Sequence, residues 1–203
     1  MEHIVHLGKD KKFQKIIALQ EPCVLVKRKN IYLHLCTSIM SQQLSTKVAD
    51  VFHQRFLNLY GKKTPTAQQI ANTPFETLRG IGLSNAKANY VLNVCRFFME
   101  EKITDAQLYK MDNEAVIKHL TQIKGVGRWT VEMILMFSLG REDVFPVDDL
   151  GIQQAVCKLY GIDATDKKLM KEKMLKISKK WSPYNTYACR YLWGWKDNTP
   201  SAP

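Results

Sequence analysis

Apolar residues recur along most of this chain at the three- and four-residue spacing of amphipathic helices, whereas the alternation typical of strands is nearly absent. Residues 24–26 are the only short stretch with strand-like composition. The pattern therefore predicts an all-α protein. The predicted helices cover residues 9–20, 31–43, 45–60, 74–79, 84–100, 113–122, 127–139, 149–160, 166–180 and 183–193.

The connections between these helices are short, and no long linker rich in proline or serine divides the chain. Gly61 and Gly161 follow predicted helices and stand where helix C-caps are expected. We therefore predict a single domain over residues 1–203, built from two helical lobes with a cleft between them. Residues 196–203 have the composition of a loose tail.

The charge of the chain is strongly positive. Thirty lysines and arginines stand against nineteen aspartates and glutamates, which gives a formal net charge of +11 and a pI near 9.4. Such an excess favours a polyanionic partner, because each phosphate that is neutralised releases counterions. Apolar residues make up 45% of the chain, which is enough for a hydrophobic core without disulfides or metal ions.

The five cysteines are scattered through apolar stretches, so neither a disulfide framework nor a zinc knuckle is expected. The N-terminus lacks the basic flank and apolar core of a secretion signal, and no apolar run approaches membrane-spanning length. We predict a cytoplasmic protein associated with the nucleoid, or a nuclear one in a eukaryote, without membrane contact.

Two glycines one residue apart, Gly125 and Gly127, stand between two predicted helices. Residues without Cβ let a tight hairpin bring its backbone N–H groups close to a phosphate. A bare Gly-x-Gly is more often an ordinary helix end, but basic neighbours favour phosphate binding here. We place the hairpin at about residues 113–139. The predicted DNA-binding residues are Lys124, Gly125, Gly127, Arg128 and Thr130.

Hairpins of this kind often hold a monovalent cation on their backbone carbonyls, and the candidates are the carbonyls of Thr121, Ile123 and Val126. A second Gly-x-Gly, in residues 79–84, echoes residues 124–129. We predict that the first copy is a packing turn and the second is the turn that grips DNA.

Two acids, Asp148 and Asp149, follow the hairpin at the predicted start of a helix. A carboxylate there can stabilise the positive charge that develops on a sugar when its N-glycosidic bond breaks, and can orient or deprotonate water. The hairpin and the acids together suggest chemistry on DNA. The alternative is that both acids only cap the helix.

A set of short segments occurs in a fixed order along the chain. They are residues 39–47, residues 80–84 with Lys87 and Ala88, residues 125–130, residues 143–150, and residues 181–184 with Tyr187, Ala188 and Trp193. This set resembles the helix-hairpin-helix DNA glycosylases, and within them the 3-methyladenine DNA glycosylase II branch. The resemblance covers about residues 31–195. Because 30 residues precede it, we expect no N-terminal β-rich domain of the kind that longer bacterial members carry.

The resemblance implies that Asp149 is the catalytic acid, and we expect Asp148 to cap the following helix. Asp148 stays the alternative, since other branches carry an acid that aligns with it. Branches that also cut the strand carry an attacking lysine at the position of Trp129, so a monofunctional enzyme that requires no cofactor is implied. The cysteines do not match the clustered set of the endonuclease III branch, so no iron–sulfur cluster is expected.

A flipped base with positive charge is held well between electron-rich rings. Trp129 and Trp193 match aromatic positions that line the family's base pocket, and Tyr187 is a further candidate. Tyr191 and Trp195 are weaker candidates. Packing in the core explains any single aromatic residue equally well.

The family inserts a side chain into the gap that the flipped nucleotide leaves. Gln43 or Leu44 occupies the matching position, while Gln42 can instead hydrogen-bond within the helix junction. The family's bacterial archetype has an apolar residue where Gln43 aligns, so the identity of this wedge stays open.

The resemblance therefore implies a monomeric, monofunctional DNA glycosylase of base excision repair. Its partner would be double-stranded DNA that contains damaged bases, and its substrate an alkylated purine of the 3-methyladenine type. Two alternatives remain: a bifunctional glycosylase/AP lyase, and a non-catalytic hairpin module that binds damaged DNA.

Overall fold

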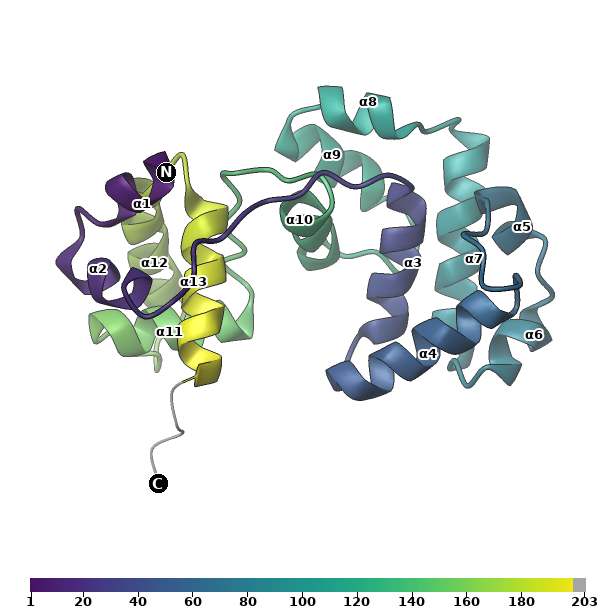
Figure 1. Cartoon of the computed structure of the whole chain (residues 1–203), viewed down its shortest axis with the longest axis horizontal. Coiled ribbons are helices and arrows are strands. Elements are labelled where there is room, and N and C mark those ends of the chain that lie inside the picture. The colour runs from purple at the N-terminus through teal and green to yellow at the C-terminus, as the bar shows by residue number, and fades with distance from the viewer. Residues whose placement is uncertain (199–203) are drawn as a thin grey trace. The chain divides into compact units, whose positions relative to one another are not determined.

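The computed structural model describes residues 1–198, which form thirteen helices and no strand (Figure 1). The prediction of an all-α protein is confirmed. The chain divides into two compact units. The central unit comprises residues 27–139, and the terminal unit comprises residues 1–26 together with the described residues from Gly140 onward. The cleft expected between the two lobes stays a prediction.

Within residues 1–198, the central unit is built from consecutive helices, whereas the terminal unit combines the first two helices with the last three. The central unit contains α3 (Ile31–Ser41), α4 (Thr46–Asn58), α5 (Ala67–Ala71), α6 (Phe75–Gly80), α7 (Asn85–Glu100), α8 (Asp105–Lys110), α9 (Asn113–Leu120) and α10 (Arg128–Phe137). The terminal unit contains α1 (Glu2–Leu7), α2 (Lys11–Ile17), α11 (Leu150–Tyr160), α12 (Lys167–Trp181) and α13 (Asn185–Asn198).

The core of the central unit lies between α3 and α7, whose apolar faces pack against each other. Leu35 and Ile39 on α3 and Val91 on α7 are fully buried. Each such side chain contributes about 1.5–3 kcal/mol to the free energy of unfolding. Cys36 and Cys95 meet inside this core as thiols, with their sulfur atoms 3.7 Å apart.

The core of the terminal unit joins the two ends of the described chain. Trp181, at the end of α12, is 1% exposed, and its ring lies 5.2 Å from the ring of Phe13 on α2. On another side it contacts the ring of Phe145 at 5.8 Å. Segments from both ends of the described chain therefore pack into one core.

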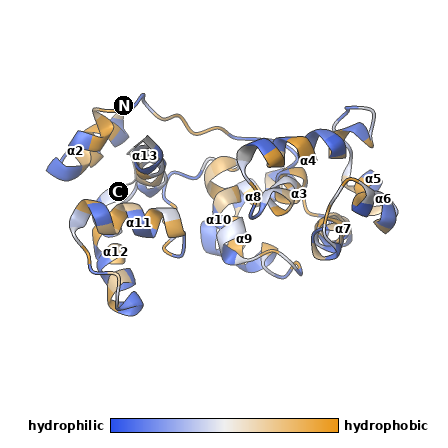
Figure 2. Ribbon diagram, turned by 90° about the horizontal axis from the view of Figure 1, so that it is seen from below, coloured by the Kyte–Doolittle hydropathy of each residue, from blue (hydrophilic) through white to orange (hydrophobic). Residues whose placement is uncertain are grey.

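The predicted helices match the structure where the apolar periodicity is long, and Figure 2 shows apolar and polar residues interleaved along helices such as α4 and α11. The prediction missed α1, α5 and α8, which have only five or six residues, because two turns show too little of the period. Residues 24–26, the only stretch with strand-like composition, are neither strand nor helix, in agreement with the all-α prediction.

The loose tail predicted for residues 196–203 is wrong for its first part, because α13 continues to Asn198. Trp195 anchors this last stretch, since the ammonium of Lys158 on α11 lies 5.3 Å from the centre of its ring. Residues 199–203 lie outside the described part of the chain.

None of the helices in residues 1–198 is long and apolar enough to cross a membrane. All five cysteines are free thiols. The described residues contain no group of three His, Cys, Asp or Glu side chains arranged to hold a metal ion.

Candidate functional site

The predicted hairpin is present as the turn between α9 and α10. Gly125 takes a φ of +102°, a left-handed conformation that disfavours every residue with a side chain. A Cβ at this position would lie 2.1 Å from Cγ of Tyr90 on α7. Only glycine therefore fits both the backbone and the packing of this turn.

Gly127 is the N-cap of α10 and differs from Gly125. Its φ of −93° suits any residue, and a Cβ would meet nothing within 4 Å. Because glycine has no side chain, no side-chain cap closes the first turn of this ten-residue helix. The N–H groups and the positive end of the helix dipole are thus left to an outside acceptor of the kind that phosphate provides.

The turn between α6 and α7 has the same backbone feature. Gly82 takes a φ of +104°, and Ser84 is the N-cap of α7. The side chain of Ser84 accepts the N–H of Lys87 at 3.2 Å. Gly82 therefore corresponds to Gly125, and Ser84 to Gly127. This register differs by two residues from the one that the sequence echo suggested, because the left-handed glycine fixes the turn and the Gly-x-Gly spacing does not.

Arg128, predicted as a phosphate contact, is held by two carboxylates in the structure. It donates to both oxygens of Glu114 on α9, at 2.6 and 3.2 Å, and to Glu132 on α10 at 3.0 Å. The hydrogen bonds to Glu114 raise the pKa of Arg128 further. Since Glu132 is 5% exposed, the arginine ties the two helices of the hairpin together. The predicted contact of Arg128 with DNA is untested, and it would require the guanidinium to leave these carboxylates.

The other predicted hairpin residues divide into one on the surface and one inside. Lys124 is exposed, and its carbonyl accepts the side-chain amide of Asn93 at 3.2 Å. Thr130 is 3% exposed, and its hydroxyl lies 3.4 Å from the amide nitrogen of Gln42. Lys124 is therefore an exposed cation beside the turn, whereas Thr130 supports the loop after α3.

The three carbonyls proposed for a monovalent cation lie along the connection between α9 and α10. The carbonyl of Ile123 accepts the N–H of Val126 at 3.0 Å. A carbonyl oxygen has two lone pairs, so this bond leaves one for an ion. The hydroxyl of Thr121 donates to the carbonyl of Ile117 at 2.7 Å. Thr121 is the C-cap of α9, so its own carbonyl lies at the helix end. The donor set fits such an ion, and its binding stays a prediction.

The candidate wedge residues follow the end of α3. Gln43 is exposed and has a φ of +60°, a left-handed conformation that is uncommon for a residue other than glycine. Leu44 is half-buried, and Gln42 bonds to Thr130 as described above. The prediction that Gln42 hydrogen-bonds within the junction is consistent with this contact, and Gln43 is the wedge candidate that reaches solvent.

Asp149, which the family resemblance implies is the catalytic acid, lies in the terminal unit and is 8% exposed. Its Oδ1 accepts the N–H of Ile152 at 2.8 Å and the indole N–H of Trp193 at 3.0 Å. Asp149 is therefore the N-cap of α11. The expectation that Asp148 caps this helix is wrong, because Asp148 is exposed and pairs with Lys171 at 2.5 Å.

The sequence reasoning missed Gly151, which stands in the first turn of α11. A Cβ there would lie 3.1 Å from Oδ1 of Asp149 and 3.1 Å from the indole nitrogen of Trp193. Glycine thus leaves room for the indole to reach the carboxylate. The signal was available as a glycine near the start of a helix, where it lowers helix propensity.

The aromatic candidates of the terminal unit have different surroundings. Trp193 bonds to Asp149, whereas the ring of Tyr187 stacks on His3 at 4.0 Å and its hydroxyl donates to Glu142 at 3.0 Å. Burial, with this bond, raises the pKa of Tyr187 to about 12. The structure brings Trp193 to the carboxylate and gives Tyr187 other contacts. A place for Tyr187 in a base pocket stays a prediction.

The two weaker candidates also have packing roles. Tyr191 is 1% exposed, and its hydroxyl accepts the N–H of Cys23 at 3.3 Å, so it belongs to the core. Trp195 is half-buried beneath Lys158.

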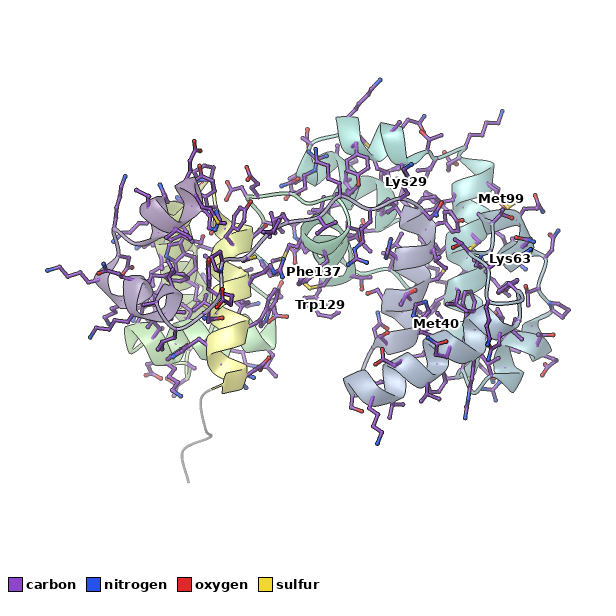
Figure 3. The ribbon with its side chains drawn as sticks, in the orientation of Figure 1. Lys29, Met40, Lys63, Met99, Trp129 and Phe137 are labelled. Atoms are coloured by element: carbon purple, nitrogen blue, oxygen red, sulfur yellow. The ribbon has the colours of Figure 1, made fainter. Side chains whose placement is uncertain are left out.

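The central unit exposes two aromatic rings on α10. Trp129 is 40% exposed and Phe137, eight residues later, is 41% exposed (Figure 3). A spacing of eight places them on one face of the helix. A cavity of about 200 Å³ between α3 and α10 is lined by residues that include Ser38, Met133 and Phe137. Phe137 was missed because an apolar residue on an amphipathic helix reads as core.

Comparison with known proteins gives these features a family. Residues 36–180 match the family model described as the HhH-GPD superfamily base excision DNA repair protein. DNA-3-methyladenine glycosylase 1 of Schizosaccharomyces pombe is 34% identical over 195 residues, which are 93% of this chain and 84% of that relative. The putative DNA-3-methyladenine glycosylase YfjP of Bacillus subtilis is 34% identical over 81% of this chain. The chain spans 58% of the length of that second relative.

Solved structures agree with the sequence comparison. The S. pombe 3-methyladenine DNA glycosylase Mag1, in complex with abasic DNA, superposes with a TM-score of 0.87 at 32% identity and covers all of both chains. A DNA-3-methyladenine glycosidase from Bacillus halodurans has a TM-score of 0.82 at 34% identity, over 95% of this chain and 88% of the other. The chain therefore belongs to the HhH-GPD superfamily of base excision DNA repair proteins.

Proposed function

We propose that this protein is a monofunctional DNA glycosylase that flips an alkylated purine, of the 3-methyladenine type, out of double-stranded DNA and hydrolyses its glycosidic bond. The observation that carries the proposal is the buried carboxylate of Asp149, held by Trp193 and by the first turn of α11. The two relatives and two structures described above are named as glycosylases of this class, which supports the same activity.

The geometry at Asp149 suits a reaction in which positive charge develops on the sugar. Two N–H groups fix Oδ1, so the carboxylate keeps one orientation without reorganising during the reaction. Placed beside the deoxyribose, its negative charge stabilises an oxocarbenium-like transition state and orients the attacking water. An alkylated purine leaves without strong acid assistance, because it already carries positive charge.

The hairpin supplies the grip on the DNA backbone in this proposal. The uncapped N-terminus of α10 offers N–H groups to a phosphate, and the exposed Lys124 adds a positive charge. A sodium or potassium ion on the carbonyls of Thr121, Ile123 and Val126 would add further positive charge beside that phosphate. The substrate is damaged double-stranded DNA, and the protein acts as a monomer in the cytoplasm on the nucleoid, or in a nucleus.

Trp129 supports the monofunctional part of the proposal. It occupies the position at which strand-cutting branches of the family carry their attacking lysine, and an indole cannot form a Schiff base with the sugar. Incubating the protein with an abasic duplex and borohydride is expected to trap no covalent complex. A trapped complex would identify a bifunctional glycosylase/lyase instead.

The main test compares Asp149→Asn with Asp148→Asn. The first variant removes the negative charge, and we expect release of 3-methyladenine and 7-methylguanine from methylated DNA to fall by about 10²–10⁴-fold. Affinity for an abasic duplex should change little, because the hairpin lies in the other unit. Asp148→Asn removes the same charge from an exposed position and should keep near-normal excision.

Each other outcome has a defined meaning. A large loss in Asp148→Asn, with Asp149→Asn active, would assign the reaction to Asp148. Wild-type protein that binds damaged duplex but releases no base from a panel of single-lesion substrates would show a non-catalytic binding module.

A further inference from the structure

The loop that follows α3 forms a tight turn with an unusual residue in it. Gln42 has φ −51° and ψ 133°, Gln43 has φ +60°, and the N–H of Leu44 donates to the carbonyl of Ser41 at 3.1 Å. These are the features of a type II turn, whose third position normally holds glycine or asparagine. A glutamine there needs support from outside the turn.

Lys87 provides such support. Its ammonium lies 2.8 Å from the carbonyl oxygen of Gln42 and 2.9 Å from that of Met40, so it satisfies two carbonyls at the end of α3. The Gln42 carbonyl belongs to the central peptide of the turn. The orientation of that peptide is what distinguishes a type II turn from a type I turn, in which the third residue has a negative φ.

The position of Lys87 depends on the first glycine turn. Lys87 stands in the first turn of α7, where its own N–H is capped by Ser84 at 3.2 Å. The matching residue after the second glycine turn is Thr130, whose hydroxyl is 3.4 Å from the side-chain amide of Gln42. Equivalent positions of two helices thus contact Gln42, one on its backbone and one on its side chain.

We propose that Lys87 is a positioning residue, which holds the peptide between Gln42 and Gln43 in its type II orientation and so fixes where the Gln43 side chain is presented to DNA. The inference rests on the proposed function, in which this loop fills the gap left by the flipped nucleotide. Without the ammonium, the turn relaxes toward type I, since a negative φ is favoured by any residue with a Cβ. The side chain of Gln43 then points elsewhere, while the hairpin and Asp149 are untouched.

The test compares Lys87→Met with Lys110→Met in the full-length protein. Lys110 is exposed at the end of α8, so its replacement removes the same charge away from the loop. The first readout is structural: a strong nuclear Overhauser effect between Hα of Gln42 and the amide proton of Gln43 marks a type II turn. We expect it to weaken in Lys87→Met and to persist in Lys110→Met and in Lys87→Arg.

The second readout is base flipping, followed by the fluorescence of 2-aminopurine placed next to an abasic site analogue. We expect flipping and excision in Lys87→Met to fall about tenfold, the effect of one unfavourable backbone conformation, with affinity for undamaged duplex unchanged. Adding Gln43→Gly to Lys87→Met should restore the nuclear Overhauser effect, because glycine takes positive φ without strain, but should not restore flipping.

The outcomes separate this inference from the proposed function. An unchanged nuclear Overhauser effect and unchanged flipping in Lys87→Met would overturn the role of Lys87 while leaving the enzyme proposal intact. Wild-type protein without excision would overturn the enzyme proposal, and the structural readout would still report on the turn. If Lys87→Met does not fold, Lys87→Gln replaces it, since its amide can reach at most one carbonyl. The same unchanged result would then overturn the inference.

Discussion

The turn between α6 and α7 and the turn between α9 and α10 have nearly the same backbone, yet their surroundings differ. Gly82 and Gly125 take φ values of +104° and +102°, and each stands two residues before a helix N-cap. The N-cap is Ser84 in the first turn and Gly127 in the second. A serine at the N-cap accepts an N–H of its own helix, which we call a closed turn, whereas a glycine cannot, which we call an open turn.

The first turn is closed by side chains of its own unit. Arg55 donates to the carbonyl of Ile81 at 3.2 Å, Arg79 donates to the carbonyl of Leu83, and Ser84 accepts an N–H from α7. Its donors and acceptors are used to build the fold and to place Lys87. The same backbone geometry serves packing or ligand binding according to whether side chains satisfy it.

Fewer side chains hydrogen-bond to the second turn. The amide of Asn93 reaches the carbonyl of Lys124, but Gly127 supplies no cap to α10. Within the turn the N–H of Val126 donates to the carbonyl of Ile123 at 3.0 Å, and Arg128 joins the two flanking helices through Glu114 and Glu132. The helices beside the turn are therefore tied together, while the first turn of α10 has no side-chain cap.

The largest expected difference between the turns comes from adding a methyl group to each left-handed glycine. Gly125→Ala should lower the free energy of unfolding by about 3 kcal/mol, because backbone strain adds to a clash with the ring of Tyr90. Gly82→Ala should cost about 1–2 kcal/mol, since its Cβ would lie 3.1 Å from the edge of Phe52, which can move. Urea denaturation of both variants measures these values.

DNA affinity sharpens this first prediction. Gly125→Ala should weaken binding to an abasic duplex even under conditions in which it is fully folded, whereas folded Gly82→Ala should bind like the wild type. Equal losses of affinity in the two variants would mean that both turns contact DNA, and the distinction between a closed and an open turn would fail.

The second prediction concerns the basic residues beside the turns. Lys124→Met should reduce the slope of log affinity against log salt concentration by about 0.9, the value for one phosphate contact. Arg79→Met and Arg128→Met should leave the slope unchanged, because the structure commits these guanidinium groups to Leu83 and to two glutamates. Titrations of a duplex at several KCl concentrations measure the slope.

A control guards against an indirect effect of the arginines. Arg128→Met should lower the free energy of unfolding, because it removes the guanidinium that pairs with the buried carboxylate of Glu132. Binding is therefore compared only where all variants are folded. A slope reduced in Arg128→Met as much as in Lys124→Met would show that Arg128 leaves its carboxylates to reach a phosphate.

Most helices could be predicted from the sequence, but the correspondence between the two glycine turns could not. The spacing of apolar residues predicts long amphipathic helices such as α7 and α12. The glycine echo was visible too, but its register was not. Only the positive φ values of Gly82 and Gly125 align the turns, and no pattern of residue types states which glycine of a pair is left-handed.

The sequence predicted individual residues of the candidate site, but not the hydrogen bonds between them. Asp149 and Trp193 were both named, but the hydrogen bond between them joins residues 44 positions apart and depends on the space left by Gly151. The identity of the helix cap was wrong for a local reason, since two adjacent acids are equally good caps and tertiary packing chooses between them. Likewise, the contact of Lys87 with Gln42 spans 45 residues and has no local signature.

The smallest expected effects come from exchanging the caps, and they test the comparison most directly. In Gly127→Ser the new Cβ meets open space, so the hydroxyl can accept the N–H of Thr130 as Ser84 accepts that of Lys87. Stability should rise by a few tenths of a kcal/mol. DNA affinity should fall at the same time, because the hydroxyl occupies a donor that a phosphate would use.

Ser84→Gly is the matched variant in the first turn. It should lower the free energy of unfolding by about the same few tenths of a kcal/mol and leave DNA affinity unchanged. Thermal denaturation and duplex titration on both variants give four numbers, and the expected pattern has opposite signs of stability with a loss of affinity in Gly127→Ser alone. If Gly127→Ser gains stability and binds DNA as well as the wild type, the amides of the second turn are not the phosphate contact, and the two turns differ in closure without differing in task.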